Sequence, residues 1–237
     1  MIAIWKRELR AYFLTPLGYV IIAVMYFFTA YYFFTYNLYG NTTDTATLFS
    51  MLFSVALFLA PPLTMRLLSE ERRVGTEQTL LTAPVSRLGI VLGKYAAALL
   101  LYLLAISGTL VMALVLQYYA QPDWPVVLGN FIGLFLLGAS LIAVCLFVSA
   151  FTESQVMAAV GGFGVSLFLI LVDALYYVVQ SRTLRVLFSR LSFNGRYQNF
   201  TAGVVDVSDL CFFISIAGLF LAFTVVVLER RRWVGGP

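Results

Sequence analysis

The 237-residue chain has no histidine, only two cysteines, and charged residues at just 11% of its length. The absence of histidine excludes acid–base and metal chemistry that depends on imidazole. Cys145 falls inside an apolar run and Cys211 at the start of another, which argues against a disulfide and gives no metal-ligand spacing. Hydrophobic residues make up 62% of the chain and the mean hydropathy is +0.94. These values exclude a soluble domain and indicate an integral membrane protein.

Six apolar runs have the length of roughly 20 residues that a helix needs to cross a bilayer. None of them alternates between polar and apolar residues as a barrel strand does. The runs are residues 17–36, 48–65, 95–119, 126–151, 156–179 and 210–228. We therefore predict an all-α integral membrane fold with six transmembrane helices, formed by residues 1–237 as a single domain.

The basic residues are distributed unevenly between the two sides of such a bundle. Of the fifteen Lys and Arg, three precede the first run, five lie in residues 66–94 and three follow the last run. Those eleven share one side, whereas the other side has four. Basic flanks stay in the cytoplasm, so we expect cytoplasmic N- and C-termini in the cell membrane of a prokaryote. The net charge of +4 follows from this topology and does not imply a nucleic-acid partner.

Residues 1–16 have an amphipathic pattern. Apolar residues recur at three- and four-residue spacing, while Lys6, Arg7, Glu8 and Arg10 lie off that stripe; the apolar positions are Ile2, Trp5, Leu9, Tyr12 and Phe13. The pattern is typical of a helix in the membrane interface, and an ordinary basic flank is the alternative. Thr15 and Pro16 then read as the N-cap and first position of a new helix.

The polar segment 66–94 separates the second run from the third. Gly75 is expected to end a short helix, and Thr76 to cap a second one over residues 77–83 that Pro84 terminates. Ser86 is a candidate cap for the helix that continues into the third span. We interpret residues 77–83 as a surface helix that docks another protein, with Leu80 and Leu81 toward the spans and Glu77 and Gln78 toward the cytosol. A solvated connecting loop is the alternative.

Two further features lie toward the other side. Asp173 is the one acidic residue well inside an apolar run, which makes it a candidate for a substrate path or for a structural bond to a hydroxyl. In the segment 181–209, Leu187, Phe188 and Leu191 belong to a helical stripe. This segment is expected either to lie on the outer surface against membrane lipid or to dip into the membrane.

The stretches WKRELRAYFLTPLGY and EERRVGTEQTLLTAPVSRLGIVLGK, together with LERRRW near the end, resemble ABC-2 type transporter permeases. The branch is the gliding-motility type, related to multi-copper-enzyme maturation. The resemblance implies a six-helix permease of the type V exporter kind that dimerises with an identical or related copy. It also implies two separate ABC ATPase subunits that bind ATP and Mg, with no cofactor bound by this chain.

The same resemblance assigns roles to residues. It implies that residues 77–83 form a coupling helix seated in the ATPase, and that 181–209 corresponds to outer gate helices. The candidate coupling residues are Glu70, Glu71, Arg72, Arg73, Gly75, Thr76, Glu77, Gln78, Leu80, Leu81 and Pro84. The candidates for a gate or path are Asp173, Leu187, Phe188 and Leu191. Relatives commonly have glutamate where this chain has Gln78, and Glu77, one residue earlier, points ~100° away around a helix.

The expected function is therefore the permease subunit of an ABC exporter, with a self-contained channel or secondary transporter as the alternative. The chain is not expected to be an enzyme, since without histidine and with Asp173 alone at membrane depth it offers no nucleophile–base pair. Residues 89–94 lack the spacing of a phosphate-binding loop, and Tyr95 stands where that loop has Ser or Thr. Energy would therefore have to come from a separate subunit.

Overall fold

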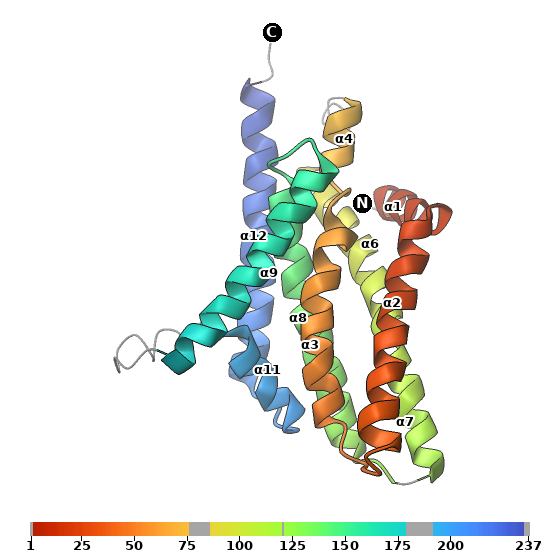
Figure 1. Cartoon of the computed structure of the whole chain (residues 1–237). Helices are drawn as coiled ribbons and strands as arrows, with labels where there is room; N and C mark the ends of the chain where they lie inside the picture. Colours follow the sequence, from red (N-terminus) through yellow and green to blue (C-terminus); the bar gives the residue numbers. More distant parts are fainter. Residues whose placement is uncertain (1, 76–85, 120, 179–191, 235–237) are drawn as a thin grey trace.

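The computed structural model describes residues 2–75, 86–119, 121–178 and 192–234, and all regular elements within them are helical (Figure 1). Six of these helical segments are long and apolar enough to cross a membrane. The predicted all-α fold with six spans is thereby confirmed. The first three spans are α2 (Pro16–Tyr32) with the π-helix η1 (Phe33–Leu38), α3 (Ala46–Thr64), and α6 (Arg87–Ile106) with α7 (Gly108–Tyr119). The others are α8 (Trp124–Ser149), α9 (Gln155–Val178) and α12 (Val207–Val234).

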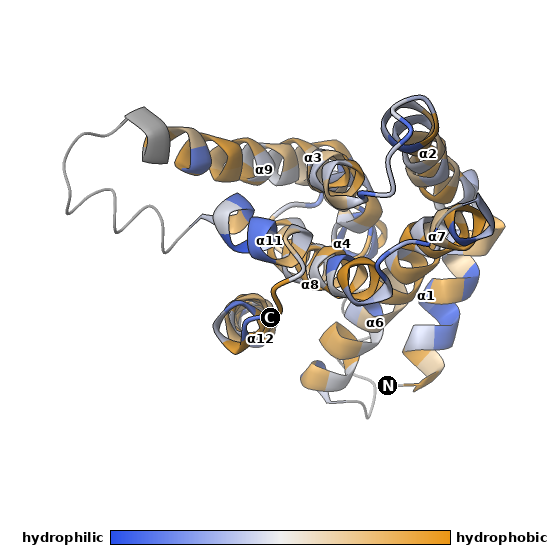
Figure 2. Cartoon of the chain, turned by 90° about the horizontal axis from the view of Figure 1, so that it is seen from below, coloured by the Kyte–Doolittle hydropathy of each residue, from blue (hydrophilic) through white to orange (hydrophobic). Residues whose placement is uncertain are grey.

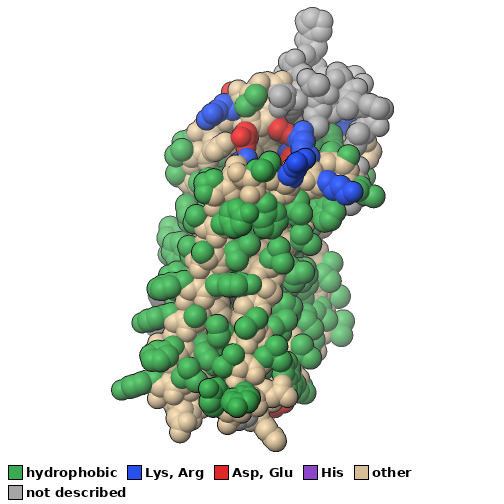
Figure 3. Space-filling view, turned by 90° about the vertical axis from the view of Figure 1, so that its right-hand side faces the viewer, with side chains coloured by type: hydrophobic (Ala, Val, Ile, Leu, Met, Phe, Trp, Pro, Cys, Tyr) green, Lys and Arg blue, Asp and Glu red, His purple; other side chains and the backbone are tan. Residues whose placement is uncertain are grey.

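Three short helices lie at the ends of the bundle. Helices α1 (Ile2–Leu14) and α4 (Ser69–Val74) are at the end where α6 begins and α12 ends, which we call the terminal face (Figure 1). Helix α11 (Phe193–Thr201) is at the opposite end, which we call the distal face, near the connection between η1 and α3. On the side of the molecule seen in Figure 3, acidic and basic side chains gather toward the terminal face, above an apolar surface.

Helix α1 lies across the end of the bundle and contacts α6 and α2 (Figures 1 and 2). Ile2 is exposed, but Tyr12 is buried and donates a 2.6 Å hydrogen bond to the Leu63 carbonyl oxygen. The predicted helix is present, with part of its apolar stripe covering protein instead of lipid. Thr15 is the N-cap of α2 in position, with extended backbone and Pro16 following it. Its hydroxyl does not cap α2, because it donates to the Ala11 carbonyl oxygen at 2.9 Å.

Helix α8 is the central element, since it packs against α3, α6, α9, α11 and α12 (Figure 2). Small residues allow the close approach. A Cβ atom built on Gly138 would lie 2.0 Å from the Tyr102 ring of α6, and one on Gly133 would lie 2.7 Å from the Phe200 side chain of α11. The Tyr102 hydroxyl donates a 3.0 Å hydrogen bond to the Leu134 carbonyl oxygen of α8. These contacts set how α6 and α11 sit on α8.

Helix α3 contains Pro61 and Pro62 and continues past them to Thr64. Proline at position 61 removes the amide that would bond the Leu57 carbonyl oxygen. That oxygen instead accepts a 2.8 Å hydrogen bond from the Ser166 hydroxyl of α9. A Cβ atom on Gly162 would lie 2.8 Å from Pro61, so α9 approaches α3 closely at this point. Elsewhere α9 extends away from the bundle and exposes apolar side chains such as Leu167 (Figures 1 and 2).

Candidate functional site

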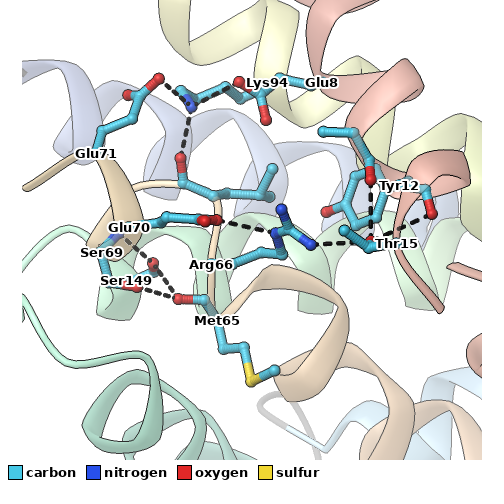
Figure 4. Close-up of polar contacts among 12 residues, drawn as sticks. Glu8, Tyr12, Thr15, Met65, Arg66, Ser69, Glu70, Glu71, Lys94 and Ser149 are labelled. Carbon is cyan, nitrogen blue, oxygen red and sulfur yellow. Dashed lines mark hydrogen bonds and ion pairs between the residues drawn. The ribbon is translucent and has the colours of Figure 1, made fainter. Parts of the chain in front are cut away.

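Lys94 of α6 is the centre of a polar cluster on the terminal face, although its side chain is only 1% exposed. Its Nζ atom lies 3.1 Å from Glu8 Oε1 of α1 and 2.9 Å from Glu71 Oε1 of α4 (Figure 4). It also donates a 2.6 Å hydrogen bond to the Leu67 carbonyl oxygen, just before α4. An ammonium group has three donors, so each has an acceptor here. One side chain therefore holds α1 and α4 on α6.

Arg7 completes this group, which we call the Lys94 cluster: Arg7, Glu8, Glu71 and Lys94. The Arg7 guanidinium pairs with Glu8 at 2.7 Å and also with Glu71. Two cations thus face two carboxylates. Burial by itself would raise the pKa of Glu8, but the positive charges of Lys94 and Arg7 and their hydrogen bonds outweigh burial, and the pKa of Glu8 lies below its usual range. Glu8 is therefore ionised at neutral pH, and the cluster is a set of ion pairs.

A second link joins α4 to the junction between α1 and α2. Arg66 Nε donates to Glu70 Oε2 at 3.0 Å, and Arg66 Nη1 donates to the Thr15 hydroxyl oxygen at 3.0 Å (Figure 4). Thr15 is the single residue between α1 and α2. Arg66 therefore connects α4 to the point where the first span begins.

The other side of α4 contacts the turn between α8 and α9. Arg72 Nη2 lies 3.0 Å from Glu153 Oε1, and Arg72 Nη1 donates to the Phe151 carbonyl oxygen at 3.1 Å. The Ser69 amide donates to the Ser149 hydroxyl oxygen at 3.3 Å, and that hydroxyl donates in turn to the Met65 carbonyl oxygen at 3.2 Å. The six-residue helix α4 is thus bonded to α1 and α6 on one side and to the turn between α8 and α9 on the other.

These contacts bear on the residues that the sequence singled out. Glu70, Glu71 and Arg72 all have ion-pair partners within the chain, so the structure places them as attachments of α4. Arg73 is exposed and has no ion pair with the residues of the described ranges. Gly75 adopts a left-handed φ of 74° and ends α4, as its position in the sequence predicted. Thr76, Glu77, Gln78, Leu80, Leu81 and Pro84, with the predicted helix 77–83, lie outside the described residues.

The Lys94 cluster is the feature that sequence reasoning missed. The sequence places Glu8 off the apolar stripe of residues 1–16 and Lys94 at the end of the polar segment 66–94. The available signal was that Lys94 is followed by a long apolar run, since a lysine at such a position needs an anionic partner when it is buried. The sequence does not reveal which carboxylates supply it.

The distal face has its own polar contacts around Asp173, which is buried near the end of α9. The Ser192 hydroxyl donates to Asp173 Oδ1 at 2.6 Å and accepts from the Gly195 amide at 2.8 Å, so it caps α11 as well. Asp173 therefore bonds a hydroxyl, the structural role that was one of its two interpretations. Leu187, Phe188 and Leu191 lie outside the described residues.

Helix α11 is also attached to α12. Arg196 Nη1 lies 2.8 Å from Asp209 Oδ1, and the Asn199 amide nitrogen donates to Asp209 Oδ2 at 2.7 Å. The Arg196 guanidinium stacks over the Phe212 ring, with its carbon 4.2 Å from the ring centroid. Within the part of the chain that the structure describes, no group of three or more Cys, Asp or Glu is arranged to hold a metal ion.

Within the described ranges, six apolar spans have ion pairs only toward their two ends, and this arrangement defines a multi-pass helical membrane protein. The chain belongs to the ABC-2 family of transporter proteins, whose family model matches residues 17–231. The ABC-2 resemblance inferred from sequence is thereby confirmed, and with it the assignment of the chain as a membrane permease of a transporter. No curated protein matches the chain significantly. Helix α1 precedes the matched residues.

Proposed function

We propose that this chain is the permease subunit of an ATP-binding cassette exporter that is driven by separate ATPase subunits. The family match over residues 17–231 carries the proposal. The ATPase subunits would bind ATP and Mg, and the permease would pair with a second identical or related copy. The excess of basic residues on the terminal face supports a cytoplasmic position for that face, in a prokaryotic cell membrane. Membership in the gliding-motility-type branch is part of this proposal.

The ATPase would dock at residues 66–94, with 77–83 as the coupling helix. Two observations support this location. Helix α4 and the start of α6 flank the segment 76–85, and both belong to the terminal face. In addition, α4 is attached on one side to α1 and α6 and on the other side to the turn between α8 and α9. A force applied by the ATPase to residues 76–85 would therefore be transmitted through α4 to α6 and to the turn between α8 and α9.

The proposal is tested by purifying the tagged chain from its native membranes in detergent and identifying the bound proteins by mass spectrometry. The wild type is compared with a variant in which residues 77–81 are scrambled. The matched control is Thr42→Ala/Thr43→Ala, two exposed residues of the distal face. We expect a cassette ATPase, with ATP hydrolysis in the purified complex, from the wild type and the control only.

Other outcomes have defined meanings. An ATPase that is retained by the scrambled variant would place the docking site elsewhere on the chain. If no ATPase accompanies the wild type, the exporter proposal fails and a self-contained channel or secondary transporter takes its place.

A further inference from the structure

The Lys94 cluster connects the helices α1, α4 and α6 on the terminal face. We infer that Lys94 is a positioning residue that holds α1, α4 and α6 as one body, so that movement of the segment 76–85 reaches α2 through α1. This inference rests on the proposed function, because it assigns a route to the movement that a docked ATPase would impose.

The Lys94 ammonium is fully bonded within the protein. Lys94 Nζ has three acceptors within 3.1 Å, from α1, from α4 and from the Leu67 carbonyl. Its side chain is 1% exposed, so water is not available to replace a lost partner. Removing one member of a buried ion pair is strongly destabilising, because the other charge is left buried without a partner. Displacing α1 or α4 relative to α6 would therefore be strongly opposed.

Two members of the Lys94 cluster lie on the two flanks of the segment 76–85. Helix α4 ends at Val74 and α6 begins at Arg87, on either side of the segment 76–85. The 2.9 Å contact between Glu71 and Lys94 joins these two flanks directly. The two described flanks of the segment are therefore joined by an ion pair, and displacement of either flank acts on Lys94.

Helix α1 is connected closely to the first span. Glu8 and Arg7 attach α1 to α6 and α4, and Thr15 alone separates α1 from α2. Arg66 bonds both Thr15 and Glu70, so the junction cannot pivot away from α4 without breaking a second set of bonds. The cluster therefore links α1 to the residues that flank the segment 76–85.

The test uses the whole complex of permease and ATPase in lipid nanodiscs and needs no knowledge of the substrate. Tyr39 follows η1 at the far end of the first span and is 84% exposed. A Tyr39→Cys reporter is made in a Cys211→Ser background, and the buried Cys145 is left in place. The rate of maleimide labelling is compared between the nucleotide-free state and the state trapped with ATP and vanadate.

Two variants of α1 are then compared. Glu8→Gln removes the carboxylate that joins α1 to Lys94, while Glu71 still neutralises the buried ammonium. Arg10→Gln is the matched control, because Arg10 is exposed on the same helix and has no ion pair with the described residues. We expect trapping to change the labelling rate severalfold in the reporter chain and in Arg10→Gln. In Glu8→Gln, that ratio should fall at least twofold, because α1 then keeps only the Arg7–Glu71 ion pair and the Arg66–Thr15 bond as polar attachments to α4, with an unchanged nucleotide-free rate and with the ATPase still bound.

A Glu8→Gln protein that responds to trapping as the control does would overturn the inference. A reporter chain that binds its ATPase but shows no response to trapping would overturn the route through α1 and α2, while the proposed function stands. If no ATPase binds, the proposed function itself has failed and takes the inference with it. If Glu8→Gln does not assemble, the neutral combination Glu8→Gln/Glu71→Gln/Lys94→Met is measured in the same way. A reduced response to trapping would then support the inference, and a response equal to that of the control would overturn it.

Discussion

Ser192 and Asp173 are joined by a 2.6 Å hydrogen bond between the serine hydroxyl and the aspartate carboxylate, which ties α11 to α9 at the distal face. The same hydroxyl accepts from the Gly195 amide and so also begins α11. One serine thus contacts two helices, and substitutions of Ser192 and of Asp173 should not be equivalent.

Replacing the serine should cost more than replacing the aspartate. Ser192→Ala removes the helix cap and leaves a buried carboxylate without its hydroxyl donor, and we expect a loss of about 1–3 kcal/mol in unfolding free energy. Asp173→Asn keeps a carbonyl oxygen that can accept from Ser192, so its loss should be smaller. The measurement is the midpoint of thermal unfolding in detergent. Equal midpoints for the two variants would contradict the double role of Ser192.

Lys94→Met should be among the most damaging single substitutions in the chain. It leaves Glu8 and Glu71 facing each other with only the half-exposed Arg7 to compensate, and we expect a loss of about 3–5 kcal/mol. Adding Glu8→Gln and Glu71→Gln removes the uncompensated charge and should restore most of the stability. Unfolding in a graded mixture of mild and harsh detergents would measure both. A triple variant no more stable than Lys94→Met would mean that packing, and not charge, dominates at this position.

The attachment of α1 should weaken in acid. The pKa of Glu8 is lowered in the folded protein, so its contribution is present above the unfolded-state pKa of about 4.3 and is lost as the pH falls through the lower, folded-state pKa. The stability difference between wild type and Glu8→Gln should therefore shrink as the pH falls below about 4.3. Thermal midpoints of both proteins across this range provide the test. A difference that stays constant with pH would show that the ion pairs of Glu8 do not contribute to stability.

Gly138 and Gly164 should respond oppositely to alanine. A Cβ atom on Gly138 would lie 2.0 Å from the Tyr102 ring, which is itself buried and bonded to α8, so Gly138→Ala forces α6 and α8 apart. A Cβ atom on Gly164 meets nothing within 4 Å, and alanine is about 1 kcal/mol better than glycine in a helix. We expect a lower thermal midpoint for Gly138→Ala and an equal or higher one for Gly164→Ala. A loss of stability in Gly164→Ala would show that another surface, such as a second copy, covers this position.

The spans were predictable because each is encoded locally. The six apolar runs correspond to the six spans, and the third begins earlier than its apolar run because Ser86 caps it, accepting from the Gly89 amide at 3.2 Å. The caps at Ser86 and Gly75 follow from residue type alone. Hydrophobic length and capping are properties of neighbouring residues, so a single sequence contains them.

The Lys94 cluster could not be predicted in the same way. Lys94 and Glu8 are 86 residues apart, and Arg7 and Glu71 are 64 apart, so the pairing depends on how α1 and α4 lie across α6. The sequence shows four charges near membrane ends and leaves their pairing open. It likewise suggested a role for Glu70, Glu71 and Arg72 toward a partner, without showing that the chain itself binds each of them.

Pro61 fixes the register between two spans. This proline leaves the Leu57 carbonyl oxygen without the amide donor of its own helix, and the Ser166 hydroxyl of α9 donates to that oxygen instead. If α9 slid by one turn along α3, the Leu57 carbonyl oxygen would lose its hydrogen-bond donor in a medium without water. The residue that interrupts one helix therefore fixes the height of another in the membrane, together with the close packing of Gly162 on Pro61.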